Sequence, residues 1–172
     1  MKNFESGLGI WQILNSSVIT DIIASAGFSL TILDLEHGLH TPQTIQDCFN
    51  AAKASSLHTC VRLPNDYYPN IVQVIDTGID SLLFPHIETE DQLKDIISQT
   101  FLTPIGNKSF SPFVPRFKYG KKSIDLVNPS LGILIESSLG LKNSEILISN
   151  QEVDFVYFGA YDLSIELGQA GD

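Results

Sequence analysis

The chain has 172 residues, of which 43% are hydrophobic, and its formal net charge is -10. This length and apolar content suit one globular domain with a buried core, while the acidic balance excludes the basic face that a nucleic-acid partner needs. No apolar run reaches the ~18 residues of a membrane helix and the N-terminus lacks the apolar stretch of a signal peptide, so we expect a cytoplasmic protein with no membrane partner.

Short apolar strands alternate with amphipathic helices along the chain. The expected strands cover residues 9–14, 28–33, 58–63, 81–84, 131–135 and 153–158. The expected helices cover residues 17–26, 42–55, 69–77, 88–99 and 138–149. Thr41-Pro42 and Thr89 are typical helix starts, and Gly27 and Gly78 mark helix ends. The alternation predicts an α/β fold with parallel strands and right-handed crossovers.

Residues 103–130 interrupt this alternation. They are rich in proline and glycine, and they contain the cations Lys108, Arg116, Lys118, Lys121 and Lys122. The pattern predicts a long basic loop with one irregular strand over residues 110–114. Loops of this length in compact domains are usually functional or disordered, so we expect this one to contribute to substrate specificity.

Polar side chains follow the expected strands at their carboxyl ends. In chain order they are Asp34, Glu36, His37, Arg62, His86, Glu136 and Asp162. In barrels and in open α/β sheets these strand ends carry the chemistry, so the residues converge if the strands form one closed or nearly closed sheet. Two carboxylates from separate strands, completed by water, suit a hard divalent cation. Zinc is disfavoured, because there is no cysteine pair and no HExxH motif.

Several of these residues also have an ordinary structural interpretation. His37 alone could be a plain loop histidine, and Glu36 could serve in structural hydrogen bonding or beside the site. His86 follows a strand-ending proline, and whether it lines the site is open. Trp11 is expected to pack in the core or at its rim. Arg62 is hard to explain by structure alone, because the chain has so few arginines.

Taken together, the motifs resemble the metal-dependent (class II) pyruvate aldolases of the HpcH/HpaI aldolase/citrate lyase family. The matching segments, in family order, are residues 9–11, 24–28, 34–37, 61–64, 75–78, 83–85, 135–136 and 158–164. They run over essentially the whole chain. The resemblance implies a TIM-type (β/α)8 barrel, a fold whose active site lies at the carboxyl ends of its strands.

The resemblance also assigns roles to residues. It implies that Glu136 and Asp162 hold a divalent metal, which could be Mg²⁺, Mn²⁺ or Co²⁺. It implies that Arg62 lies at the enolate oxygen, and that His37, held by Asp34, is the general acid and base.

Substrate binding is implied at a separate segment. The backbone around Gly159, Tyr161 and Asp162 would receive the carboxylate of pyruvate. The implied reaction is the reversible cleavage of a 4-hydroxy-2-oxo (2-keto-3-deoxy) acid to pyruvate and an aldehyde through a metal-bound enolate. Family members assemble as trimers or hexamers, so a homo-oligomer is expected.

The chain departs from the family pattern in three places. Leu134 stands where glutamine is common, and Gly159-Ala160 stands where Gly-Pro is common. A complete barrel takes about 250 residues, so we expect one domain over residues 1–172 that stops before the eighth strand, either as a fragment or completed by assembly. Two alternatives stay open: an acyl-CoA lyase of the citryl or malyl type, and a non-catalytic truncated barrel.

Overall fold

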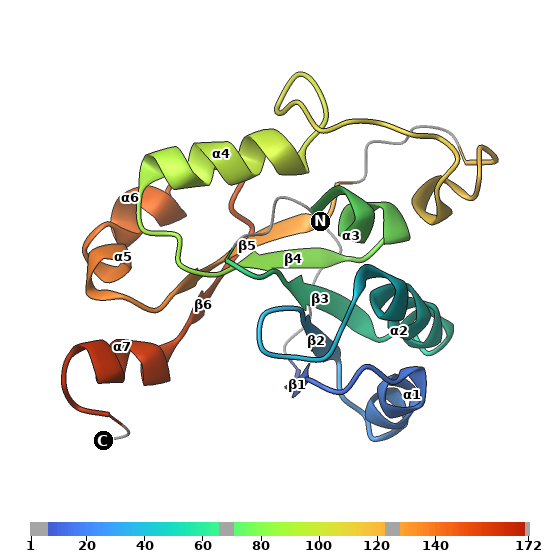
Figure 1. Ribbon diagram of the computed structural model, residues 1–172, viewed down its shortest axis with the longest axis horizontal. Helices are drawn as coiled ribbons and strands as arrows, with labels where there is room; N and C mark the ends of the chain where they lie inside the picture. The colour runs from blue at the N-terminus through green and yellow to red at the C-terminus, as the bar shows by residue number, and fades with distance from the viewer. Residues whose placement is uncertain (1–6, 66–70, 123–127, 171–172) are drawn as a thin grey trace.

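Six parallel strands form one curved sheet, in the spatial order β1-β2-β3-β4-β5-β6. The computed structural model describes residues 7–65, 71–122 and 128–170 (Figure 1). The strands are β1 (Gly9–Gln12), β2 (Leu30–Asp34), β3 (His58–Arg62), β4 (Ser81–Phe84), β5 (Ser130–Ile135) and β6 (Phe155–Phe158). The helices are α1 (Ser17–Ser25), α2 (Pro42–Ala54), α3 (Ile71–Thr77), α4 (Glu90–Thr100), α5 (Ser138–Lys142), α6 (Ser144–Ile148) and α7 (Ala160–Glu166), with one 3-10 turn, η1 (Pro115–Phe117).

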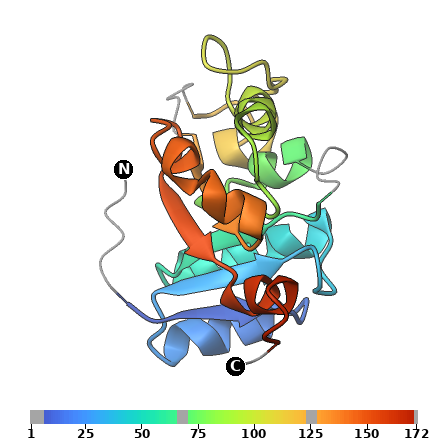
Figure 2. The same cartoon turned by 90° about the vertical axis from the view of Figure 1, so that its left-hand side faces the viewer.

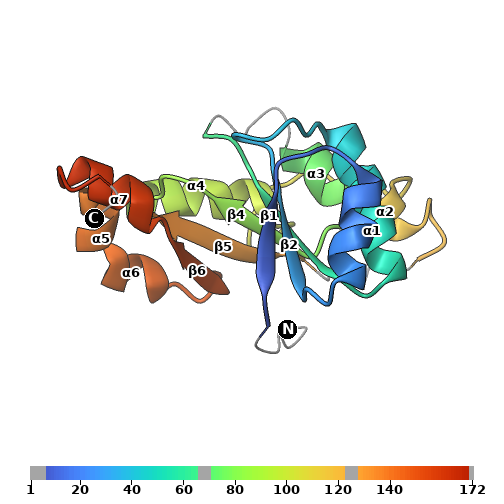
Figure 3. The same cartoon turned by 90° about the horizontal axis from the view of Figure 1, so that it is seen from below.

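The sheet curls like part of a barrel. Each strand pairs in parallel with the next strand along the chain, and Figures 2 and 3 show the curvature from β1 to β6. Across the concave side, the Trp11 indole Nε1–H donates to the Tyr157 hydroxyl at 3.1 Å, although these residues lie on the two edge strands. The predicted α/β class with parallel strands is confirmed. The described residues form an open, curled sheet of six strands, which is consistent with the truncated barrel that the sequence predicts.

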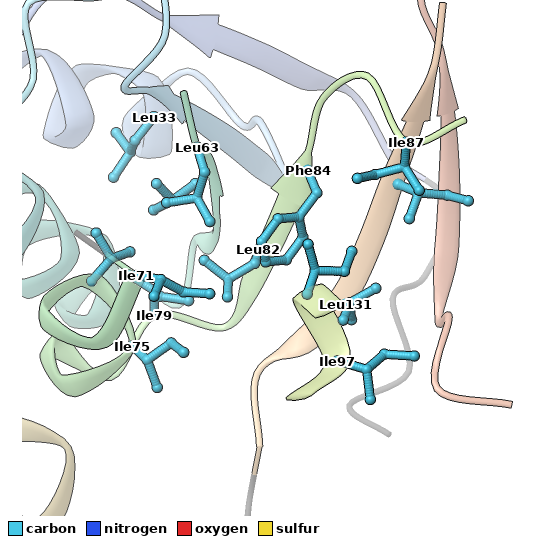
Figure 4. Packing of buried hydrophobic residues seen from close by; sticks show 14 of the residues in the cluster. Leu33, Leu63, Ile71, Ile75, Ile79, Leu82, Phe84, Ile87, Ile97 and Leu131 are labelled. Carbon is cyan, nitrogen blue, oxygen red and sulfur yellow. The ribbon is translucent and has the colours of Figure 1, made fainter. Parts of the chain in front are cut away.

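The main core lies between the convex face of the sheet and the helices that cover it (Figure 4). Side chains alternate between the two faces of a strand, so Leu33, Leu82 and Leu131 point to the helices and are fully buried. A second cluster fills the concave face, and its buried members are Ile32, Cys60, Leu83 and Leu134. Cys48 and Cys60 are free and buried.

The helix boundaries follow the predicted start and stop signals. Thr41 and Thr89 each form a capping box at the first turn of α2 and α4. Gly27 and Gly78 adopt positive φ angles of 88° and 100° just after α1 and α3, a conformation that costs glycine little. Residues 69–70 of the expected third helix lie outside the described residues. None of the described helices combines the length and apolar content that a membrane span needs.

The expected helix over residues 138–149 is two short helices. The break falls at Asn143, whose side-chain Nδ2 donates to the backbone carbonyl of Glu88 at 2.8 Å. This contact ties the α5–α6 junction to the loop that follows β4. The seven-residue helix α7 was not predicted. It begins directly after β6, and it is the element that carries Tyr161 and Asp162.

The predicted irregular strand over residues 110–114 is wrong. This segment is a turn that leads into η1, with prolines at 112 and 115 removing two backbone donors that a strand would use. The loop is fixed to α3 instead: Lys108 Nζ lies 3.2 Å from Asp76 Oδ1, and Arg116 donates to the carbonyl of Ile75 at 3.4 Å.

The same segment also lies away from the place where we expected it to act. It connects the end of α4 to the start of β5, so its described residues belong to the amino-terminal side of the strands. Figure 1 shows this yellow segment on the side of the molecule away from α7. Its predicted role in substrate specificity therefore conflicts with its position.

Candidate active site

An arginine–aspartate pair lies at the carboxyl ends of β2 and β3. Asp34 and Arg62 are direct partners in the β2–β3 register. The guanidinium Nε donates to Asp34 Oδ1 at 2.9 Å, and one terminal nitrogen donates to Oδ2 at 2.5 Å. Both side chains are largely buried, at 2% exposure for Asp34 and 11% for Arg62. This bidentate geometry fixes the plane of the guanidinium.

Two further side chains hold Arg62 from other directions. Its second terminal nitrogen lies 3.1 Å from Glu36 Oε2. The guanidinium carbon lies 4.6 Å from the centre of the Trp11 ring, a cation–π contact. Trp11 is therefore part of the site, where we had expected ordinary core or rim packing. Glu36 joins the site through an ion pair, which favours the second of its two interpretations.

The pKa of Asp34 lies below its ordinary value of 3.8. Burial alone would raise this pKa, but the hydrogen bonds and charge of Arg62 outweigh burial, and the amides of Glu36 and His37 add to the effect. These amides donate to Asp34 Oδ1 at 3.0 and 3.3 Å. Asp34 is therefore an ionised carboxylate that organises both the Arg62 side chain and the backbone of the following loop.

His37 lies in that loop with an exposed side chain. Its backbone amide, rather than its imidazole, is the group that donates to Asp34. The loop turns tightly here, because a Cβ added at Gly38 would come within 2.2 Å of the Asp34 carbonyl oxygen. Asp34 thus positions His37 through the main chain, and the ring is free to face a substrate.

A buried carboxylate stands directly after β5. Glu136 is 6% exposed, and its Oε1 accepts the backbone N–H of His86 at 3.0 Å. The His86 ring also approaches Oε1, with Nδ1 at 3.2 Å. Burial raises the pKa of Glu136, His86 opposes the rise, and the nearby carboxylates of Glu36 and Asp162 add to it. Three acidic side chains therefore act on one another at this end of the sheet.

The β6–α7 junction lies against this carboxylate. A Cβ added at Gly159 would come within 2.6 Å of Glu136 Cβ and 3.1 Å of Oε2. Asp162 lies in the first turn of α7 and is exposed, and Tyr161 beside it is 67% exposed. The amides of Tyr161 and Asp162 belong to the first turn of a helix, where backbone N–H groups have no intrahelical acceptor.

The residues present fit a hard divalent cation bound with outside ligands. Across the described ranges, no three His, Cys, Asp or Glu side chains are grouped closely enough to hold an ion alone. Mg²⁺ in proteins is commonly held by one or two carboxylates, with water and substrate oxygens completing the shell. The raised pKa of Glu136 fits the same picture, because a cation would relieve the repulsion among the carboxylates.

Most of these residues were located from the sequence by one expectation, that polar side chains at the carboxyl ends of parallel strands lie together. It brings Asp34, Arg62 and Glu136 to one end of the sheet, and the charges of Arg62 and Glu136 act on each other there. The same expectation left the position of His86 open. It also missed Tyr157, whose hydroxyl accepts a hydrogen bond from Trp11. Both aromatic residues could have been found from the alternation of side chains along β1 and β6, which places them on the concave face.

Comparison with known proteins agrees with the family resemblance that the motifs indicate. The model of the HpcH/HpaI aldolase/citrate lyase family matches residues 7–172. A 2-keto-3-deoxy-L-rhamnonate aldolase from Escherichia coli O1:K1 / APEC is 30% identical over 176 residues, which cover 98% of this chain and 65% of that protein. The chain thus spans slightly less than two thirds of the length of this relative.

Solved structures share the fold. An HpcH/HpaI aldolase/citrate lyase family protein from Burkholderia cenocepacia J2315 superposes with a TM-score of 0.90 at 25% identity, covering 98% of this chain and 69% of its own. The protein CitE from Mycobacterium tuberculosis, solved in complex with magnesium and acetoacetate, has a TM-score of 0.60 at 19% identity, covering 99% and 62%. Because the family model covers nearly every residue from β1 to α7, this chain belongs to the HpcH/HpaI aldolase/citrate lyase family.

Proposed function

We propose that this chain carries the active-site residues of a divalent-metal-dependent aldolase. The substrate would be a 4-hydroxy-2-oxo (2-keto-3-deoxy) acid, cleaved reversibly to pyruvate and an aldehyde. The observation that carries the proposal is the pairing of one fixed cation, Arg62, with a buried carboxylate, Glu136, at the carboxyl ends of parallel strands. The name of the Escherichia coli relative supports the same substrate class.

Each residue has a role that its contacts support. Glu136 and Asp162 would hold the cation, which would act as a Lewis acid on the oxygen that becomes negative when pyruvate loses a methyl proton. Arg62, fixed by Asp34 and Glu36, would stabilise the same negative charge without having to reorganise. The amides of the first turn of α7 would bind the pyruvate carboxylate.

Proton transfer would fall to His37. Its ring is exposed at the end of the sheet, and its backbone is held by Asp34. An imidazole can both give and take a proton, which suits the two directions of a reversible reaction. His37 follows β2, and Arg62 ends the neighbouring strand β3, which supports a shared site for the two side chains.

The test is hydrogen exchange at the methyl group of pyruvate. Proton NMR in D₂O with Mg²⁺ present should show loss of the methyl signal, and EDTA should stop it. Glu136→Gln and Asp162→Asn should each abolish the metal-dependent exchange while the circular-dichroism melt stays that of a folded protein. Glu90→Gln, an exposed site on α4, is the matched control and should exchange like wild type.

Three results would contradict the proposal. Exchange that survives Glu136→Gln would remove the metal assignment. A folded wild-type protein that gives no exchange, but cleaves a citryl or malyl thioester, would be an acyl-CoA lyase instead. A folded protein that does neither would be a non-catalytic member of the family.

We also propose that the six strands are part of one barrel domain. The Trp11–Tyr157 contact supports this, because it joins the two edge strands across the concave side. A (β/α)8 barrel has eight strands, so further strands would be needed between β6 and β1 to close it. We expected a stop before the eighth strand, whereas the described residues contain six.

A further inference from the structure

Among the described residues, polar partners reach only one of the carboxylate oxygens of Glu136. Oε1 accepts the His86 amide at 3.0 Å and lies 3.2 Å from His86 Nδ1. In the described part of the chain, no hydrogen bond reaches Oε2. A single residue therefore approaches one oxygen of the carboxylate with both its backbone N–H and its ring.

The second oxygen faces the other half of the site. Oε2 lies on the side of Gly159, since a Cβ added there would be 3.1 Å from this atom. Gly159 is directly followed by α7, which carries Asp162 in its first turn. Oε2 is thus directed toward the segment that holds the other acidic side chain, and Oε1 is directed toward the β4 loop.

The backbone of His86 is strained in a way that accompanies this contact. Its φ angle is 52°, in the left-handed region that residues other than glycine adopt in only a few per cent of cases, although asparagine, aspartate and histidine are enriched there. Such strain persists where surrounding contacts fix it, and it concentrates at functional sites. Here the conformation lets the amide and the ring of one residue reach the same oxygen atom.

We propose that His86 is a positioning residue that holds Oε1 of Glu136, so that Oε2 is the single oxygen presented to a divalent cation. The inference rests on the proposed function of Glu136 as a metal ligand. It also sets the kind of ion that the site prefers. One-oxygen binding by a carboxylate suits a small octahedral ion such as Mg²⁺ or Mn²⁺, whereas Ca²⁺ commonly uses both oxygens of a carboxylate.

The test compares metal binding in four proteins by electron paramagnetic resonance of free Mn²⁺. These are wild type, His86→Gly, His86→Asn and Glu136→Gln. Glycine removes the ring but accepts the positive φ without strain. Asparagine also tolerates this φ and restores a side-chain N–H donor. The backbone amide remains in every variant, so only the ring contact changes.

The expected results are specific. His86→Gly should weaken Mn²⁺ binding by about 10–100-fold, the usual cost of losing a group that orients a metal ligand. His86→Asn should recover most of this loss. Competition with Ca²⁺ and Mg²⁺ should show a shift of preference toward Ca²⁺ in His86→Gly, because both oxygens of Glu136 become available.

The outcomes separate this inference from the proposed function. If wild type binds Mn²⁺ and Glu136→Gln does not, but His86→Gly binds like wild type, the role of His86 is overturned and the metal site stands. The role of His86 is likewise overturned if His86→Asn binds Mn²⁺ no better than His86→Gly. If wild type does not bind Mn²⁺, or if Glu136→Gln binds as tightly, both the inference and the proposed metal site are overturned.

Discussion

Arg62 interacts with three acidic side chains of the candidate site. It forms a bidentate pair with Asp34 and an ion pair with Glu36, and its charge also acts on Glu136. A buried guanidinium with these partners cannot change its geometry cheaply, because losing one partner leaves a buried charge uncompensated. The chemistry of the site and the stability of the β2–β3 edge therefore depend on the same side chain.

This pairing predicts an acid-dependent loss of stability. The folded pKa of Asp34 is below its ordinary value of 3.8, so its contribution is present above that value and is lost as the pH falls through the folded pKa. In urea unfolding series at pH 5, 4 and 3, Asp34→Asn should show a shallower fall in the free energy of unfolding than wild type. Asp91→Asn, at an exposed site on α4, should keep the wild-type slope. Equal slopes for Asp34→Asn and wild type would contradict the prediction.

The raised pKa of Glu136 predicts the opposite dependence of stability on pH. Its folded pKa is raised above 4.5, so the favourable contribution is present below that value and is lost as the pH rises through the folded pKa. At pH 7 without metal, Glu136→Gln should therefore be more stable than wild type, with each 1 kcal/mol raising Tm by about 2–4 °C. Added Mg²⁺ should raise the Tm measured by calorimetry for wild type but not for Glu136→Gln. A variant that still gains stability from Mg²⁺ would show that the ion binds elsewhere.

For single residues, the sequence predicts where a side chain lies better than it predicts which groups that side chain contacts. That Asp34, Arg62 and Glu136 share one end of the sheet follows from parallel strands alone. That Asp34 binds the amide of His37 rather than its ring depends on a turn that the residue pattern does not specify. The orientation of His86 depends on a left-handed backbone angle after Pro85, and histidine, although enriched in that region, adopts it too rarely for the sequence to reveal it.

The β6–α7 junction shows how an element fixes the site. Gly159 lies against Glu136 because no side chain fits between them. Gly159→Ala should push the junction away, lowering the free energy of unfolding by about 1–3 kcal/mol, as overpacking does. The same variant should lose Mn²⁺ affinity, because Asp162 moves with the junction. Ala160→Ser, one residue on, is the control for both measurements. Unchanged stability and affinity in Gly159→Ala would rule out this close contact.

The segment over residues 101–122 should affect stability but not chemistry. Lys108 is 5% exposed and pairs with Asp76 on α3, on the side of the strands away from Glu136. Lys108→Met should cost about 1.5–3 kcal/mol, the value for hydrogen bonds to charged groups. Urea unfolding measures this loss, and the rate of pyruvate methyl exchange below the transition should match wild type. A changed exchange rate would restore the specificity role that the sequence predicted for this segment.

The elements themselves were predictable to within a few residues. Strand positions followed from short apolar runs, and α2 and α4 followed from their caps. The break at Asn143 was not predictable, because it depends on a hydrogen bond to Glu88, a residue far away in the chain. Nor was α7, whose sequence follows β6 without any loop. Helical periodicity is hard to read over so few residues.

For the whole molecule, the contact between Trp11 and Tyr157 connects the two edges of the sheet. The rings meet edge to face with centroids 5.5 Å apart, in addition to the hydrogen bond. The chain has one tryptophan. Its fluorescence therefore reports on this contact and on the neighbouring Arg62 guanidinium, while far-UV circular dichroism reports on all the helices and strands.

If this contact couples the two edges, wild type should unfold in urea with coincident fluorescence and circular-dichroism transitions. Tyr157→Leu keeps an apolar residue on the concave face but removes the hydroxyl and the aromatic ring. In that variant the fluorescence transition should occur at lower urea, because β1 then loses its contact with β6. Tyr161→Leu, an exposed tyrosine on α7, should leave the two transitions coincident. Coincident transitions in Tyr157→Leu would mean that the parallel ladder from β1 to β6 is sufficient by itself to make the fold cooperative.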